Sequence, residues 1–99
     1  MIARIWHGKT KASDADEYRD FLIKRAIPDY KSSEGNISVH ILRRIEGEET
    51  HFITLTLWEN VEVIKGFAGE DIERAKYYPE DENYLLEFEP TVTHYEVVD

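Results

Sequence analysis

The four histidines are the side chains in this sequence best suited to proton transfer near neutral pH, because imidazole titrates there. They are His7, His40, His51 and His94. His40 lies within an alternating apolar segment and is the best candidate for a general base, with a hydrogen-bonded structural histidine as the ordinary alternative. The other three could gather at one end of a sheet and bind zinc or iron. No short ligand spacing supports that arrangement, so we expect no metal site.

Residues that are missing exclude several kinds of chemistry. The chain has no cysteine, which removes disulfides, thiol catalysis, iron–sulfur clusters and thiolate zinc sites. It has no glycine-rich phosphate loop, dinucleotide fingerprint or ordered Ser-His-Asp set. We therefore expect no cofactor. Twelve basic and 21 acidic residues give a net charge of −9, and this disfavours nucleic acid and anionic membrane as partners, since both require a cationic surface.

The length of 99 residues fits one domain spanning residues 1–99. The longest apolar run is too short to span a bilayer. No basic segment followed by an apolar one stands near Met1, so the sequence shows no signal peptide, and we expect a cytoplasmic location. The acidic excess lies in the second half, and the run at residues 80–82 is typical of a solvated surface.

Hydrophobic periodicity and turn residues divide the chain into alternating strands and helices. In the first half, the predicted elements are a strand at 2–7 ended by Gly8, a helix at 13–27 begun by Ser13 and ended or kinked by Pro28, and a turn at 32–35. Hairpin strands follow at 36–46 and 50–58. The second half then has a helix at 61–68 between Asn60 and Gly69, a helical turn from Asp71 to Tyr77, an acidic loop at 80–86 and a strand at 91–98. This order predicts an α+β, ferredoxin-like βαββαβ fold with sheet order 4-1-3-2.

The register of the hairpin decides which side chains share a face of the sheet. A three-residue turn at 47–49 places Ile41 opposite Leu55 and makes one face apolar. The opposite face is then semi-polar and holds eight residues of this hairpin: Ser38, His40, Leu42, Arg44, Phe52, Thr54, Thr56 and Trp58. Helices cover only one face of such a sheet. Two partly apolar faces therefore predict a homodimer in which the sheets of two chains pack together.

The segment Thr54-Leu55-Thr56-Leu57-Trp58-Glu59-Asn60, followed by Ile64, Phe67, Ala68 and Ala75, resembles the antibiotic biosynthesis monooxygenase (ABM) family. The resemblance extends from Ile2 to Val98 and is strongest from Phe52 to Tyr78. It implies a dimeric α+β barrel with a pocket between helices and sheet in each subunit.

The resemblance also implies activities. The family includes cofactor-free oxygenases of phenols and quinols, and heme-degrading enzymes. The heme degraders use an Asn on the first strand, a Trp on the second helix and a later His. Here Phe67 and Tyr77 occupy the Trp and His positions and residues 2–8 contain no Asn, so we expect no heme turnover, although Tyr77 could in principle bind iron as a phenolate.

The resulting hypothesis is a cofactor-independent monooxygenase acting on a small phenolic or quinol-type compound. Its candidate catalytic residues are His40 as base, Arg44 as the cation that steadies developing negative charge, and Tyr77. Its candidate substrate-binding residues are Trp58, Phe52 and Phe67. The alternative is a non-catalytic dimeric small-ligand-binding or scaffold protein of the same fold, which a pocket filled by its own aromatic side chains would favour.

Overall fold

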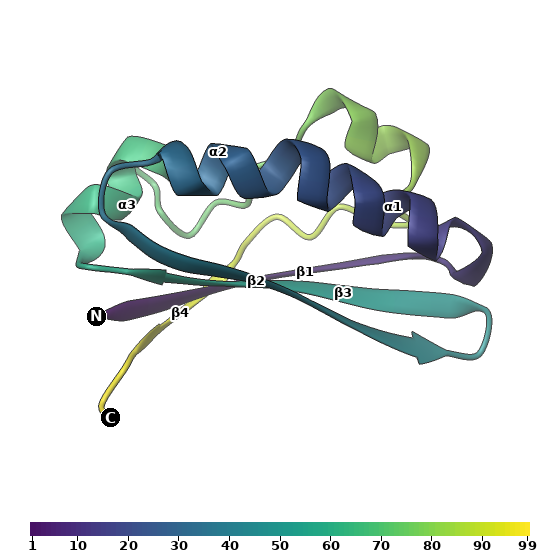
Figure 1. Cartoon of the computed structure of the whole chain (residues 1–99), viewed down its shortest axis with the longest axis horizontal. Coiled ribbons are helices and arrows are strands. Elements are labelled where there is room, and N and C mark those ends of the chain that lie inside the picture. The colour runs from purple at the N-terminus through teal and green to yellow at the C-terminus, as the bar shows by residue number, and fades with distance from the viewer.

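The computed structural model describes all 99 residues and contains one four-stranded antiparallel sheet. The strands are β1 (Ile2–Lys11), β2 (Asn36–Glu46), β3 (Glu49–Trp58) and β4 (Thr93–Glu96), and their order is β2-β3-β1-β4. The predicted α+β class and sheet order are confirmed. All helices lie on one face of this sheet, and no element covers the other (Figure 1).

The first helical segment is longer than predicted. It consists of α1 (Ala15–Phe21), a π-helical turn (Leu22–Ala26) and α2 (Ile27–Ser32), after a short 3₁₀ turn at Ala12–Asp14. Pro28 does not end it. A proline has no N–H to give to the carbonyl four residues earlier, and its ring crowds that carbonyl. The wider π turn directly before Pro28 accommodates both effects. The predicted Ser13 cap is wrong, because no side-chain cap bond begins α1.

The helix α3 (Val61–Ala68) has the predicted bounds. The Oδ1 of Asn60 accepts a hydrogen bond from the backbone N–H of Val63 at 3.0 Å and so caps its start. Gly69 follows its end with φ of 92°, a conformation that favours glycine.

The strand β1 continues past Gly8, contrary to the prediction that this glycine ends it. Gly8 lies two residues from Trp6 on the same face, and a Cβ at Gly8 would stand 2.5 Å from Cη2 of the Trp6 ring. The glycine therefore makes room for an indole ring that lies across its own strand.

The hairpin register differs by one residue from the prediction. Glu46 pairs with Glu49, so the turn has two residues, and Ile41 faces Thr54 rather than Leu55. Gly47 adopts φ of 62° at the first turn position, as a type II′ turn requires. A bulge between Asn36 and Ser38 shifts the pairing again near the start of β2.

This register reverses the predicted face of β3 relative to β2. Phe52, Thr54 and Trp58 of β3 point to the helices and are buried, and Val39 and Ile41 of β2 lie on the same side and are partly buried. The uncovered face, called the bare face below, carries side chains from all four strands. They include Ile5 and His7 of β1, His40, Leu42 and Arg44 of β2, His51, Ile53, Leu55 and Leu57 of β3, and Thr93 and Tyr95 of β4.

The segment between α3 and β4 differs from the predictions. Residues 71–77 form no helix; instead Arg74 makes an isolated bridge with Thr91. The acidic run forms a 3₁₀ turn (Pro79–Asn83) in which Asp81 is only 2% exposed, so this run is not a simple solvated surface. β4 pairs only with residues 2–5 of β1. Further along the same edge of β1, the backbone N–H of Leu86 donates to the carbonyl of Lys9. No helix is long and apolar enough to cross a membrane.

Candidate functional site

A small cavity lies between the sheet and the layer of helices. Its volume is about 10 Å³, which is the space of roughly one water molecule. Nine residues line the cavity, and they come from β1, β3, the long helical segment and the loop after α3. They are Trp6, Tyr18, Leu22, Ala26, Tyr30, Thr54, Lys76, Tyr78 and Asp81. An acid, a lysine, three phenols and an indole thus line one small cavity.

The floor of the cavity is the cross-strand pair Trp6 and Thr54. The Nε1 of Trp6 is buried and has no hydrogen-bond partner. The other tryptophan is satisfied, because Nε1 of Trp58 donates to Oγ1 of Thr56 at 2.8 Å. A buried donor without an acceptor costs free energy. Trp6 is therefore the indole whose donor has no partner at hydrogen-bond distance, although the Tyr77 hydroxyl lies close enough for Trp6 to lower the pKa of that phenol against the effect of burial.

The wall is formed by the long helical segment, where Leu22 and Ala26 of the π turn lie between Tyr18 and Tyr30. The hydroxyls of Tyr30 and Thr54 lie 3.3 Å apart. Burial raises the pKa of Tyr30, so its phenol stays protonated at neutral pH. Its ring stacks on Phe67 with centroids 4.6 Å apart. The wall is rigid and aromatic.

The roof carries the buried carboxylate of Asp81. Its Oδ1 accepts from the hydroxyl of Tyr18 at 2.8 Å, and its Oδ2 accepts from the backbone N–H of Tyr78 at 2.7 Å. Burial is the largest influence and raises the pKa of Asp81 above its ordinary value, although the two hydrogen bonds oppose it. A carboxylate with a raised pKa is a stronger base than one in water.

A second aspartate, Asp29 of α2, holds two of the residues that line the cavity. Its Oδ2 accepts from the hydroxyl of Tyr78 at 2.5 Å and from Nζ of Lys76 at 2.9 Å. Burial acts to raise the pKa of Asp29, but the hydrogen bonds from Tyr78 and Lys76 outweigh it and the pKa lies below its ordinary value. Lys76 also stands 4.2 Å above the ring of Phe67. These contacts tie the loop after α3 to α2.

The structure does not bring the six predicted site residues together. Phe52, Trp58 and Phe67 are buried in the helix-side core, where Phe52 packs edge-on against Tyr18 and Trp58 lies 5.5 Å from the ring of Phe67. None of the three lines the cavity itself. Tyr77 is also on this side, edge-on to Trp6 at 6.2 Å, and its hydroxyl donates to the carbonyl of Glu89 at 2.5 Å.

His40 and Arg44 lie on the bare face, on the far side of the sheet from those four residues. His40 pairs with Leu55 rather than Thr56 and is exposed. Arg44 pairs with His51, and its Nη2 donates to Oε2 of Glu46 at 3.3 Å. The shared face predicted for His40, Arg44 and Trp58 is wrong, because the one-residue change of register sends β2 side chains to the opposite side relative to β3.

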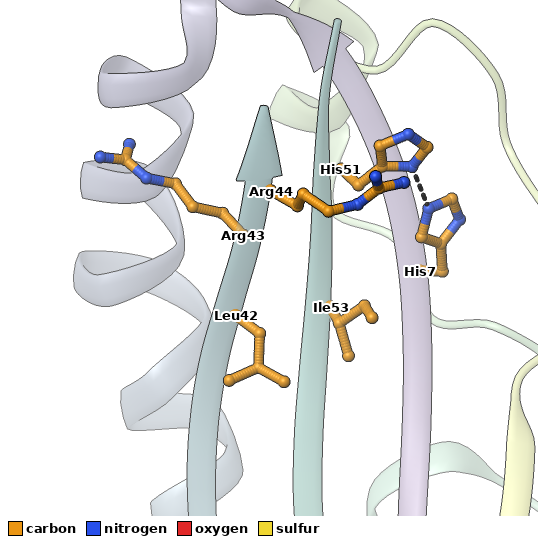
Figure 2. A pocket seen from close by; sticks show the side chains of 6 residues that line it. All are labelled: His7, Leu42, Arg43, Arg44, His51 and Ile53. Carbon is orange, nitrogen blue, oxygen red and sulfur yellow. Dashed lines mark hydrogen bonds between the residues drawn. The ribbon is translucent and has the colours of Figure 1, made fainter. Parts of the chain in front are cut away.

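Two of the three histidines expected at one end of the sheet do meet. Nε2 of His7 and Nδ1 of His51 lie 2.9 Å apart on the bare face. They line a hollow of about 360 Å³ with Leu42, Arg43, Arg44 and Ile53 (Figure 2). His94 lies on the other face, where its Nε2 is 3.1 Å from Nη1 of Arg4. Burial and the charge of Arg4 lower the pKa of His94.

None of the nine residues that line the cavity was in the predicted site. Those whose polar groups matter most to its chemistry are Trp6, Tyr30, Lys76 and Asp81. For Trp6 a signal exists, since Gly8 two residues later leaves space on the same face of a strand. Asp81 stands in a run of like charges, and the sequence does not distinguish the one that becomes buried. Lys76 and Tyr30 acquire their places only through the packing of the loop on α2.

A scan against protein-family models and a sequence search of curated proteins find no match. Solved structures do match. A "putative antibiotic biosynthesis monooxygenase" from Nitrosomonas europaea superposes with a TM-score of 0.71 at 13% identity, covering 100% of both chains. A further antibiotic biosynthesis monooxygenase matches with a TM-score of 0.65 at 11% identity, again over 100% of both chains. The chain has the ABM fold.

The heme-degrading protein MhuD from Mycobacterium tuberculosis also shares the ABM fold. Its structure, with two hemes bound in its active site, matches with a TM-score of 0.65 at 21% identity, covering 99% of this chain and 96% of that one. The residues of the cavity do not fit heme here. No histidine lines the cavity. Burial raises the pKa of Tyr77, which disfavours the phenolate that iron would need.

Proposed function

We propose that this ABM-fold protein is a cofactor-independent monooxygenase that acts on a small phenolic or quinol-type compound in the helix-side cavity. The observation that carries the proposal is the unpartnered Nε1–H of Trp6, which is buried in the wall of a cavity that also holds an acid and a cation. A buried donor of this kind is ready for an oxygen anion that develops during reaction.

In this proposal Asp81 removes the phenolic proton of the substrate. The Nε1–H of Trp6 and the ammonium of Lys76 hold the resulting phenolate oxygen, and the rings of Tyr18 and Tyr30 pack on its faces. The electron-rich ring carbon then combines with O₂ to form a hydroperoxide. Loss of water leaves a quinone, with one oxygen atom in the product and one in water. The substrate supplies both electrons, so no further reductant is needed.

Substrate entry requires the loop after α3 to move, because the cavity holds only about one water molecule. The ties to be broken are side-chain contacts at the rim: those of Tyr78 and Lys76 to Asp29, and the ion pair of Arg25 with Glu80 at 3.7 Å. Exposed ion pairs of this type contribute little stability. The loop can therefore open without unfolding the sheet or α1.

The small cavity is also the observation that favours the alternative, a non-catalytic ligand-binding or scaffold protein. Its own aromatic rings occupy the space in which a substrate would lie. The two functions differ in one measurement, the consumption of oxygen with a reactive phenol or anthrone-type compound.

We further propose that the protein is a homodimer joined through the bare face. Leu42 and Tyr95 are 45% and 57% exposed there, beside the half-buried Ile5, Leu55 and Leu57. A continuous apolar surface on one face of a sheet is typical of an interaction site. A second copy would cover it without blocking the helix-side cavity.

The test of the activity is an oxygen-electrode assay with a panel of phenols, quinols and anthrones, followed by mass spectrometry of products formed under ¹⁸O₂. We expect one labelled oxygen atom in the product. Trp6→Phe and Asp81→Asn should lower the rate at least tenfold, while the matched control Trp58→Phe, assayed where it remains folded, should retain it. Binding of the compounds without oxygen uptake would support the alternative instead.

A further inference from the structure

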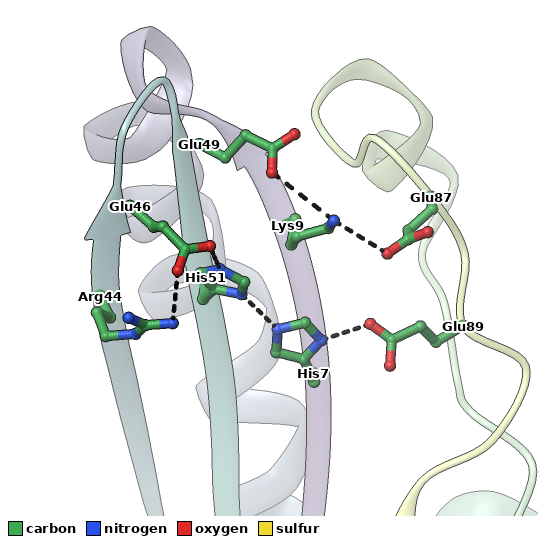
Figure 3. A network of polar contacts seen from close by, with 8 residues as sticks. All are labelled: His7, Lys9, Arg44, Glu46, Glu49, His51, Glu87 and Glu89. Atoms are coloured by element: carbon green, nitrogen blue, oxygen red, sulfur yellow. Dashed lines mark hydrogen bonds and ion pairs between the residues drawn. The ribbon is translucent and has the colours of Figure 1, made fainter.

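Four side chains on the bare face form one chain of contacts. Nδ1 of His7 contacts Oε2 of Glu89, Nε2 of His7 lies 2.9 Å from Nδ1 of His51, and Nε2 of His51 lies 3.0 Å from Oε1 of Glu46 (Figure 3). Each histidine thus has one nitrogen on a carboxylate and the other facing its neighbour. The helix-side cavity lies across the sheet and shares none of these residues.

The hydrogens of this chain do not balance for neutral histidines. Each carboxylate accepts, so Nδ1 of His7 and Nε2 of His51 must each carry a hydrogen. A neutral imidazole carries only one. The two inner nitrogens then face each other at 2.9 Å with a lone pair each. This contact is repulsive unless a positive species lies between them, and the species that two imidazoles accept is a proton or a metal ion.

The charges around the pair are negative in sum. Glu46, Glu89 and Arg44 are linked to the two histidines, and the ion pairs of Lys9 with Glu49 and Glu87 form a separate group beside them (Figure 3). With both histidines neutral, each group holds two carboxylates and one cation and so has a net charge of −1. A divalent cation between the histidines would offset the two groups together.

We propose that His7 and His51 form a binding site for a divalent transition-metal ion of the imidazole-preferring class, Cu²⁺ or Ni²⁺. Metal–imidazole bonds are about 2.0–2.1 Å long, so two of them at a right angle separate their nitrogens by about 2.9 Å. A tetrahedral angle would separate them by about 3.3 Å. The observed 2.9 Å equals the right-angle separation that the square-planar or octahedral geometry of Cu²⁺ and Ni²⁺ requires, but it is also an ordinary hydrogen-bond distance, and both rings must turn to point at one ion.

The two carboxylates then act as positioning residues. A histidine that binds a metal usually gives its other N–H to a carboxylate, which fixes the ring orientation and makes the free nitrogen more basic. Glu89 does this for His7, and Glu46 does it for His51. The two carboxylate contacts are present without the metal, so the remaining change on binding is a rotation of the rings toward the ion.

The protein supplies two ligands, since no group of three or more His, Asp or Glu side chains converges. The adjoining hollow of about 360 Å³ leaves room for water at the remaining positions in the single chain, and the proposed dimer would enclose it together with the site. The rings face each other nearly head-on, with centroids 5.1 Å apart. Binding an ion therefore turns both rings toward it and displaces any proton held between them.

The test uses the untagged full chain at pH 7 with one equivalent of CuCl₂ or NiCl₂. We expect stoichiometric binding by calorimetry, and a Cu²⁺ electron paramagnetic resonance spectrum with coupling to two imidazole nitrogens. His7→Gln and His51→Gln should each weaken binding at least tenfold and leave coupling to one nitrogen. Glu46→Gln and Glu89→Gln should weaken binding about tenfold.

His40→Gln is the matched control, because His40 lies on the same face outside the pair, and its binding should equal that of the native chain. Circular dichroism of each variant verifies folding. The proposal is overturned if neither ion binds at 100 μM, since a proton alone then bridges the pair. Binding that survives His51→Gln, or that is equally weakened by His40→Gln, overturns it as well. None of these outcomes depends on oxygenase activity.

Discussion

The two faces of the sheet are built from the same strands but differ in what their side chains can do. On the helix side, Trp6, Phe52 and Trp58 are packed dry against aromatic rings, and one acid, Asp81, is buried among them. On the bare face, apolar side chains such as Leu42 are partly exposed beside a chain of histidines and glutamates. The helix-side face is covered by helices of the same chain, whereas no element of the chain covers the bare face (Figure 1). Catalysis that excludes water fits the first, and association or ion binding fits the second.

The largest expected difference between the faces is in the free energy of unfolding. Trp58→Ala should lower it by about 3–5 kcal/mol, because it leaves a cavity in a fully packed core. Leu42→Ala should lower it by less than about 1 kcal/mol in the monomer, since the leucine is half exposed. Urea denaturation at low protein concentration measures both. Equal losses would show that the bare face is packed against something in the native state.

Association through the bare face should depend on its apolar side chains. Tyr95→Glu, or the same change at Leu42, should weaken dimerisation by about 2 kcal/mol, roughly thirtyfold in Kd. Light scattering across micromolar concentrations measures the mass. Glu substitution of the exposed Ile23 on the helical segment is the control and should not change it. A native chain that is monomeric at these concentrations contradicts the proposal.

The packing of Trp6 over its own strand can be tested at Gly8. Gly8→Ala should destabilise the protein by about 1–3 kcal/mol, since the added Cβ meets the indole at 2.5 Å and forces it to move. In Trp6→Leu the same change should cost less, because the crowding ring is absent. Thermal or urea melts of the double-mutant cycle measure this coupling. Additive effects would mean that the glycine serves another purpose.

The two aspartates at the cavity should give opposite pH dependence of stability. The folded pKa of Asp29 lies below its ordinary 3.8, so its contribution is present above pH 3.8 and is lost as pH falls through the folded value. The folded pKa of Asp81 lies above 3.8, so stability declines as pH rises from 3.8 through that value. Urea melts from pH 2.5 to 7 measure the free energy of unfolding. As pH rises, the native chain should become more stable relative to Asp29→Asn and less stable relative to Asp81→Asn. Parallel curves would contradict the assigned burial.

The smallest effect is expected at His40. The sequence predicts it as the general base, but it lies on the bare face, across the sheet from the cavity. We expect His40→Ala to change the free energy of unfolding by no more than about 0.5 kcal/mol and to leave oxidation of a responsive phenol unchanged. Loss of oxidation in a well-folded variant would restore His40 as the base and move the active site to the bare face.

Much of the fold follows from local signals. The sheet order, the helix between Asn60 and Gly69 and the strands of the hairpin were predicted because caps, turns and periodicity act over a few residues. The register was mispredicted because each face of β3 carries both apolar and polar side chains. Hydrophobicity alone therefore did not identify which face of β3 is buried. Gly47 carried the missing signal, since a glycine at the first position of a two-residue turn is the mark of type II′.

The sequence by itself determined the order of the strands and of the two main helical segments, and the absence of thiol chemistry. The tertiary structure decided which residues meet. Asp81 becomes a buried carboxylate only because the loop after α3 folds onto Tyr18, and its two acidic neighbours in sequence stay in water. His7 and His51 become a pair only because β1 lies beside β3 in one register. Such contacts join residues more than forty positions apart, and a shift of one residue along a strand would turn each side chain to the other face.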